Sequence, residues 1–204
     1  MVAPNTVEFY SKPDYQDSAK TANLEDVEHY VLGVNYFSYH LGNGTKLLVW
    51  DHSNFYDNKI WEQDQQSLPK VSPGSMQCYQ VLRGEKHHAS SVIGIRFKDA
   101  TGGKPKAFLL ILKLAKIGDV PLYSDESDKY AIGGTITQSG PPVTTAVYVR
   151  DETTKEYICN GSIFFKWDEE NEKVAIGDTT NWPKELKITD DGKNNFTITL
   201  ISTH

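Results

Sequence analysis

The sequence FYSKPDYQD at residues 9–17 has a counterpart, VWDHSNFYD, at residues 49–57. At an offset of 40 residues the two segments align Tyr10 with Trp50, Tyr15 with Phe55 and Asp17 with Asp57. The same offset lays YFSYHL at 36–41 over MQCYQV at 76–81. Because two separate landmarks share one register, this part of the chain is predicted to hold two copies of a unit of about 40 residues.

Each copy has the pattern of antiparallel strands. Apolar residues alternate at Val7 and Phe9, and again at Leu47 and Val49, which is the period of half-buried strands. One such unit cannot bury its apolar face alone, whereas two packed face to face form a small sandwich. The first domain is therefore predicted to span residues 1–84. A short helical turn is expected at 23–27, where an acidic residue follows an N-cap candidate by three positions.

The register stops near residue 85, and a different pattern follows. Turn signals such as TGG at 101–103 and SGPP at 139–142 separate short strand-like segments, and no helical period is visible. An all-β sandwich of immunoglobulin type is predicted for residues 85–204. Its strands are expected at 92–97, 107–114, 129–137, 144–149, 156–167, 173–176, 186–189 and 196–201.

The repeated unit resembles the Greek-key motif of the βγ-crystallins. It has an aromatic residue, a second aromatic five positions later, a tight turn two positions beyond that, and a closing strand bearing Ser38. The family usually has Gly where this chain has Asp17 and Asp57, and Asp accepts a left-handed backbone less readily than Gly does. The resemblance implies a double Greek-key fold.

Two stretches near the end of the chain are similar to the calcium-dependent cell adhesion molecule family of Dictyostelium. They are NGSIFFKW at 160–167 and WPKELKITDD at 182–191, followed by FTITL at 196–200. That family joins a βγ-crystallin-like domain to an immunoglobulin-like domain, in the order expected here, so the chain is interpreted as a divergent paralogue. The resemblance implies homophilic, calcium-dependent adhesion by a protein that sits peripherally on the outer cell surface without a signal peptide.

A calcium site is the cofactor prediction that follows. In calcium-binding βγ-crystallins the loop before the closing strand carries amide or acidic residues and ends in Ser, and here only the first copy keeps that Ser. Ca²⁺ takes six to eight oxygen ligands. The favoured ligands are Asn35, Ser38, Asp51 and Asp57, with Asp14, Asp17 and Asp64 as further oxygen donors on neighbouring turns. The alternative is that these acids are solvated loop residues.

Composition narrows the function classes. The 204 residues carry 21 Lys and Arg against 27 Asp and Glu, a net charge of -6, which argues against a nucleic-acid binder. The most apolar segment, 107–114, is too short to span a membrane and contains Lys113. The start of the chain shows no signal-peptide pattern, so synthesis in the cytoplasm is expected. The motifs of common hydrolases, phosphate loops and zinc enzymes are absent, and no enzyme activity is expected.

The acidic surface suggests how calcium could control self-association. Residues 1–84 carry 6 Lys and Arg against 10 Asp and Glu, so a divalent cation there would relieve repulsion between copies. The predicted function is therefore adhesion with the protein itself as partner and a peripheral attachment to the cell surface. Two alternatives stay open: an intracellular calcium-binding structural protein, and a lectin that presents Tyr56 and Trp61 to sugars.

Overall fold

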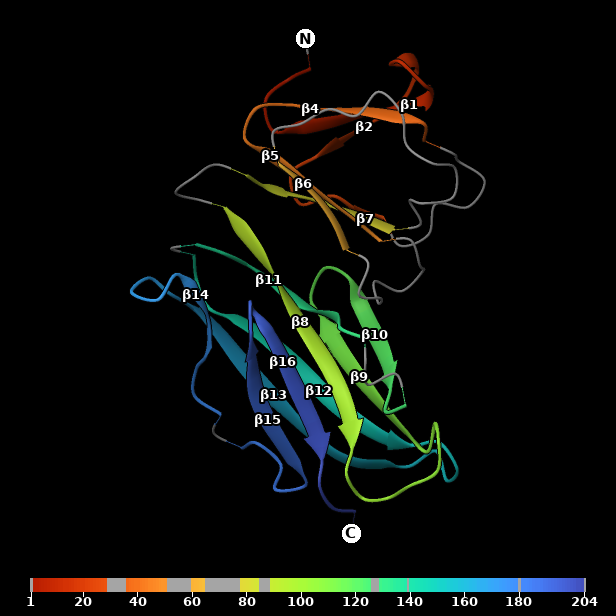
Figure 1. Cartoon of the computed structure of the whole chain (residues 1–204), viewed down its shortest axis with the longest axis vertical. Coiled ribbons are helices and arrows are strands. Elements are labelled where there is room, and N and C mark those ends of the chain that lie inside the picture. The colour runs from red at the N-terminus through yellow and green to blue at the C-terminus, as the bar shows by residue number, and fades with distance from the viewer. Residues whose placement is uncertain are drawn as a thin grey trace. The chain divides into compact units, whose positions relative to one another are not determined.

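The computed structural model describes residues 2–28, 36–50, 60–64, 78–84, 89–125, 129–138, 140–179 and 181–203, with the backbone alone at residues 19 and 60–64. Every regular element in this part of the chain is a β-strand, which confirms the all-β prediction. The chain divides into two compact units, Met1–Ser90 and Ser91–His204. The predicted division lies after Gly84, shortly before this boundary. Each unit is described by itself (Figure 1).

Two sheets build the N-terminal unit, with strand orders β2-β1-β4 and β3-β7-β5-β6. The short strand β3 belongs to the first copy of the repeat but pairs with β7 of the second copy. This exchange links the two copies, as a Greek-key arrangement requires. The strands are β1 (Thr6–Lys12), β2 (Gln16–Asn23), β3 (Val27–Glu28), β4 (Ser38–Leu41), β5 (Thr45–Trp50), β6 (Ile60–Asp64) and β7 (Cys78–Arg83).

The 40-residue offset is visible in the strand register. In the first copy Tyr10 lies opposite Ser38, and in the second Trp50 lies opposite Cys78. Every pair between β1 and β4 has a counterpart between β5 and β7 with both numbers raised by 40. The repeat read from the sequence is therefore a repeat of backbone pairing.

The core of this unit lies between its two sheets and is rich in aromatic residues. Phe9 is fully buried, with its ring centroid 4.7 Å from that of Tyr36 and 4.8 Å from that of Tyr79. Aromatic pairs at this separation add about 0.5–1.5 kcal/mol beyond the area they bury. The alternating residues that predicted the strands are thus the residues that join the two copies.

The helical turn expected at 23–27 is wrong. Asp26 does reach back as a capping side chain would, since its Oδ2 accepts a hydrogen bond from the Asn23 N–H at 2.7 Å. The chain then enters β3 instead of a helix. Pairing with β7 satisfies the backbone at Val27 and Glu28, so tertiary pairing overrides the local signal.

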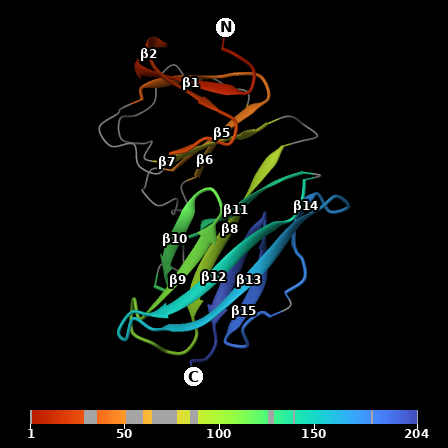
Figure 2. The ribbon, with the colours of Figure 1, turned by 180° about the vertical axis from the view of Figure 1, so that it is seen from behind.

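Two packed sheets also form the C-terminal unit, as two layers that Figure 1 and Figure 2 show from opposite sides. Their strand orders are β10-β9-β12-β13-β14 and β11-β8-β16-β15. All eight predicted segments are strands, and the immunoglobulin-type assignment stays a prediction. The strands are β8 (Ser90–Asp99), β9 (Phe108–Leu114), β10 (Gly118–Tyr123), β11 (Ala131–Thr137), β12 (Val143–Asp151), β13 (Tyr157–Asp168), β14 (Lys173–Ile176), β15 (Leu186–Gly192) and β16 (Asn195–Leu200).

Strand β10 was not predicted from the sequence. It contains Pro121, which cannot donate a ladder hydrogen bond, and Asp119, a residue depleted in strands. Its position explains both residues, because among the described strands β10 lies at the edge of its sheet and pairs with β9 alone. An edge strand tolerates proline where its N–H side faces away from the ladder.

Candidate functional site

Ser38, a predicted calcium ligand, ties the β1–β2 hairpin to strand β4. Its side chain is fully buried. The Ser38 hydroxyl donates to the Lys12 carbonyl oxygen at 2.7 Å and accepts a hydrogen bond from the Tyr15 N–H at 3.1 Å. The hydroxyl therefore satisfies two backbone groups of the hairpin turn, which is a structural role.

Asp14 and Asp17 lie on the same turn with exposed side chains. Both have a left-handed backbone, with φ of 55° at Asp14 and 54° at Asp17. This matches the expectation that Asp17 stands where the crystallin motif usually has Gly. Its carboxylate pairs with the Lys12 ammonium at 2.5 Å, and because both side chains are exposed the pair adds little stability.

The side chains of the other predicted metal ligands are not described. Asn35, Asp51 and Asp57 lie outside the described residues, and Asp64 is described only as the last backbone position of β6. Within the described ranges no group of three or more His, Cys, Asp or Glu residues could hold an ion. The Ser38 hydroxyl has two hydrogen bonds within the turn and the Asp17 carboxylate is paired with Lys12, so the described donors do not define a calcium site by themselves.

A second candidate site is the outer face of the five-stranded sheet in the C-terminal unit. Residues of β9 and β12 alternate across this sheet: Leu110, Leu112, Val147 and Val149 are fully buried, so their neighbours in the chain point outward. Three tyrosines lie on the outward side, from three different strands. They are Tyr123 on β10, Tyr148 on β12 and Tyr157 on β13, and we call them the tyrosine face.

The tyrosine face is bordered by cations. The Lys106 Nζ lies 5.4 Å from the centroid of the Tyr123 ring, and the Lys113 Nζ lies 5.0 Å from that of Tyr148. Tyr148 and Tyr157 meet edge to face at 5.9 Å, and Tyr157 is 56% exposed. Tyrosine has an apolar ring with a polar tip, and lysine has an apolar stem with a charged head, so this surface suits a boundary between water and an apolar phase.

Not every cation here is available to a partner. The Arg150 Nε lies 2.6 Å from Glu152, whose other oxygen is 2.8 Å from the Lys155 Nζ. The hydrogen bond from Arg150, followed by that from Lys155, lowers the pKa of the Glu152 carboxyl. Both cations of this group are bonded to Glu152, which leaves the group of three with a net charge of +1, whereas Lys106 and Lys113 project from the face with exposed side chains.

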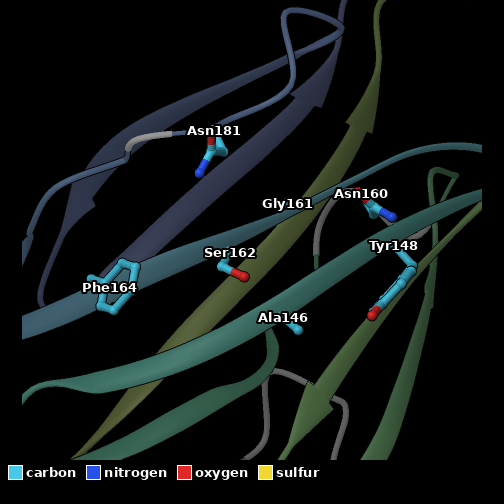
Figure 3. A pocket seen from close by; sticks show the side chains of 7 residues that line it. All are labelled: Ala146, Tyr148, Asn160, Gly161, Ser162, Phe164 and Asn181. Carbon is cyan, nitrogen blue, oxygen red and sulfur yellow. The ribbon is translucent and has the colours of Figure 1, made fainter.

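An open pocket of about 440 Å³ adjoins the tyrosine face. Figure 3 shows its side chains on one side of β12 and β13, with a further residue from the chain after β14. The cross-strand pairs Tyr148–Asn160 and Ala146–Ser162 form its floor. Its lining consists of Ala146, Tyr148, Asn160, Gly161, Ser162, Phe164 and Asn181.

Asn181 also lines the pocket, and it begins residues 181–185, which we call the strap. The strap passes so close to Gly161 that a Cβ there would lie 2.6 Å from the Pro183 Cδ and 3.2 Å from the Trp182 Cε3. The Trp182 Nε1–H donates to the Leu186 carbonyl at 2.9 Å, which anchors the strap to β15. The absence of a side chain at Gly161 is what allows this approach.

The outer face of the other sheet has a different character. There the Asp191 Oδ2 accepts hydrogen bonds from the Arg96 Nη2 at 3.1 Å, from the Tyr130 hydroxyl at 3.0 Å and from the Thr197 hydroxyl at 2.5 Å. Polar groups on this side are bonded to one another. The two outer faces therefore differ: around Asp191 the polar groups bond one another, whereas the five-stranded sheet presents the tyrosine face with Lys106 and Lys113 beside it.

The tyrosine face and the pocket of the C-terminal unit were not predicted from the sequence. The signal was present, since alternate residues in YVR at 148–150 and NGSIF at 160–164 fall on one face of a strand. Knowing which alternate set faces outward required the positions of the buried residues. In the described part of the chain no helix is long and apolar enough to cross a bilayer.

Comparison with known proteins gives this surface a context. Residues 93–201 match a family model described as membrane binding. The crystal structure of Abundant Perithecial Protein from Neurospora crassa is similar to this chain with 34% sequence identity and a TM-score of 0.76, over 98% of this chain and 97% of that one. None of the curated proteins matches the chain significantly.

A separate structure of the βγ-crystallin domain of the Neurospora protein, in its Ca²⁺-bound form, also matches. The identity is 25% and the TM-score 0.38, over 42% of this chain and 97% of that domain. A likeness of this size carries no argument about the metal site of this chain. The full-length relative and the strand register support the βγ-crystallin-like fold. Since the membrane-binding model matches more than half of its 204 residues, this chain belongs to that family.

Proposed function

We propose that the protein attaches peripherally to membranes, and that the tyrosine face with Lys106 and Lys113 contacts the lipid. The family match over residues 93–201 is the observation that carries this proposal. The geometry supports it, because tyrosines are enriched at the interface between lipid and water. Lys106 and Lys113, which have no carboxylate partner among the described residues, would add attraction to anionic headgroups.

The charge of the unit sets an upper limit on the electrostatic contribution. The matched segment carries more acidic than basic residues, so a general attraction to anionic lipid is not available. Attraction must come from the local lysines, at about 1 kcal/mol per charge near an anionic surface. Removing both is therefore expected to weaken binding roughly 30-fold, since about 1.4 kcal/mol is tenfold.

The experiment is co-sedimentation of the full chain with vesicles of phosphatidylcholine, alone or mixed with phosphatidylserine. The double variant Lys106→Gln, Lys113→Gln should lose most of its affinity for the mixed vesicles. The matched control is Lys98→Gln, Lys187→Gln, which removes two exposed lysines from the other sheet and should bind as wild type. Equal losses in both double variants, or no binding by the wild type, would refute the proposal.

Calcium binding by the N-terminal unit stays a prediction, and so does the homophilic adhesion on an outer cell surface that it would control. Its support is the crystallin-like register and the sequence resemblance given above. Sizing of the full chain with Ca²⁺ and then with chelator tests both at once. Reversible self-association supports adhesion, and an unchanged monomer counts against it.

A further inference from the structure

We propose that the pocket between Tyr148, Phe164 and the strap binds an uncharged saccharide. This inference does not rest on membrane attachment, because a soluble oligosaccharide would occupy the site equally well. It also differs in place from the lectin hypothesis drawn from the sequence, whose candidates Tyr56 and Trp61 have no described side chains.

The pocket offers hydrogen bonds without charge. None of its lining residues is acidic or basic. In the part of the chain that the structure describes, the side chains of Asn160, Ser162 and Asn181 make no hydrogen bond within the molecule. An amide both donates and accepts, as a pair of sugar hydroxyls does, so two amides and one hydroxyl match a polyol in both bonding directions.

Aromatic rings stand on both sides of these polar groups. Tyr148 lies opposite Asn160 across the β12–β13 ladder, and Phe164 lies further along β13 with 40% of its surface exposed. A phenylalanine this exposed on a strand leaves apolar surface for a ligand to cover. The C–H faces of a sugar ring would cover the rings while the ring's hydroxyls bond the amides.

The dimensions suit a short oligosaccharide. Outward residues of one strand are spaced by roughly 6.6 Å, so the row from Asn160 through Ser162 to Phe164 is about 13 Å long. The volume of about 440 Å³ falls within the range of small-ligand sites. The pocket is open to solvent, which leaves room for the rest of a glycan chain.

Other ligand classes fit less well. A phosphate or carboxylate finds no cation among the lining residues. A purely apolar ligand would leave two amides and a hydroxyl desolvated without partners, which costs about 1–3 kcal/mol for each group. A neutral, hydroxyl-rich ligand meets neither penalty.

Backbone hydrogen bonds hold the segment that carries Asn181 before a ligand arrives. Asn181 has a left-handed backbone with φ of 71°, and the next residue is held by the Trp182 N–H bond to the Thr179 carbonyl at 2.9 Å. The Leu186 N–H bonds the Pro183 carbonyl at 3.1 Å. Binding would therefore cost little ordering of the chain, which favours measurable affinity.

The test uses the full chain and NMR titration of the Asn side-chain amides with maltotriose, cellotriose, chitotriose and lactose. Sialyllactose and AMP are the charged probes. We expect at least one neutral saccharide to shift the amide signals of Asn160 and Asn181. Asn160→Ala and Asn181→Ala should each weaken that binding at least fivefold, while Thr199→Ala, on the other sheet, should not change it.

A second set of experiments distinguishes a free saccharide from a lipid-borne one, and saccharide binding from phospholipid binding. Sedimentation with vesicles that contain glucosylceramide or lactosylceramide tests a lipid-borne sugar, and binding lost in Asn160→Ala supports the pocket as its site. The Lys106→Gln, Lys113→Gln variant should keep saccharide binding even if it loses phospholipid binding. The proposal is overturned if no neutral saccharide binds in either form, if only the charged probes bind, or if Thr199→Ala loses as much affinity as the two Asn variants.

Discussion

Replacing Ser38 with Ala should destabilise the N-terminal unit whether or not calcium is present. The substitution removes two hydrogen bonds of a fully buried hydroxyl, to the Lys12 carbonyl and from the Tyr15 N–H. Each contributes about 1 kcal/mol net, so the loss is about 2 kcal/mol. For a unit of this size about 1 kcal/mol corresponds to 4–8 °C, so its melting transition should fall by roughly 8–16 °C.

The assay is differential scanning calorimetry of the full chain in the presence of a chelator, with the C-terminal unit as internal reference. Ser38→Cys is the informative second variant, because Cys78 occupies the equivalent position of the other copy. A thiol is a weak donor and acceptor, so its loss should be smaller. Ser18→Ala is the control, since this exposed hydroxyl donates to Glu8 and its removal should cost under about 0.5 kcal/mol. If Ser38→Ala melts as wild type in chelator and loses only calcium affinity, Ser38 is a metal ligand and the structural role is wrong.

Three further perturbations probe the turn, the strap and a thiol. Asp17→Val should destabilise the N-terminal unit by about 1–2 kcal/mol because a β-branched residue resists the left-handed backbone. Asp17→Gly should be nearly neutral. Urea denaturation compares the two variants, and equal losses of stability would contradict the strain argument. Gly161→Ala should cost about 1–3 kcal/mol by pushing Pro183 away, and an unchanged thermal transition of the C-terminal unit would show that the strap yields freely. Burial, followed by the nearby Glu185 carboxylate, raises the pKa of the Cys159 thiol to about 11. Iodoacetamide should therefore label Cys159 slowly at pH 8 and faster only as the pH approaches 11. Rapid labelling of the folded chain at pH 8 would contradict this.

The sequence predicted the fold where repetition and alternation carried the information. The offset of 40 between Tyr10 and Trp50 reappears as identical cross-strand pairing, because both copies bury apolar residues at equivalent positions, such as Phe9 and Val49. The helical turn at 23–27 failed since its local signal, the Asp26 contact to Asn23, is compatible with a tight turn as well. Strand β10 was missed because its proline is acceptable only at a sheet edge, and edges are a property of the whole sheet.

The site was less predictable than the fold. Ser38 was predicted as a calcium ligand, which stays a prediction; its hydrogen bonds to two backbone groups of the hairpin could not be predicted from the linear spacing. The pocket likewise requires Asn181 to meet Asn160 from a separate segment. Packing brings such separate segments together, so the sequence indicates suitable residue types, but only the structure shows which of them lie in one site.

One consequence of the C-terminal topology concerns synthesis on the ribosome. Strand β16 lies between β8 and β15 and runs parallel to β8, with Gly94 opposite Asn195, 101 positions later in the chain. Contacts of such high order form slowly, since a long loop must close first. The nascent β8 therefore emerges with one edge uncovered and waits for almost the entire unit to be translated, which makes it the segment that a chaperone would need to shield.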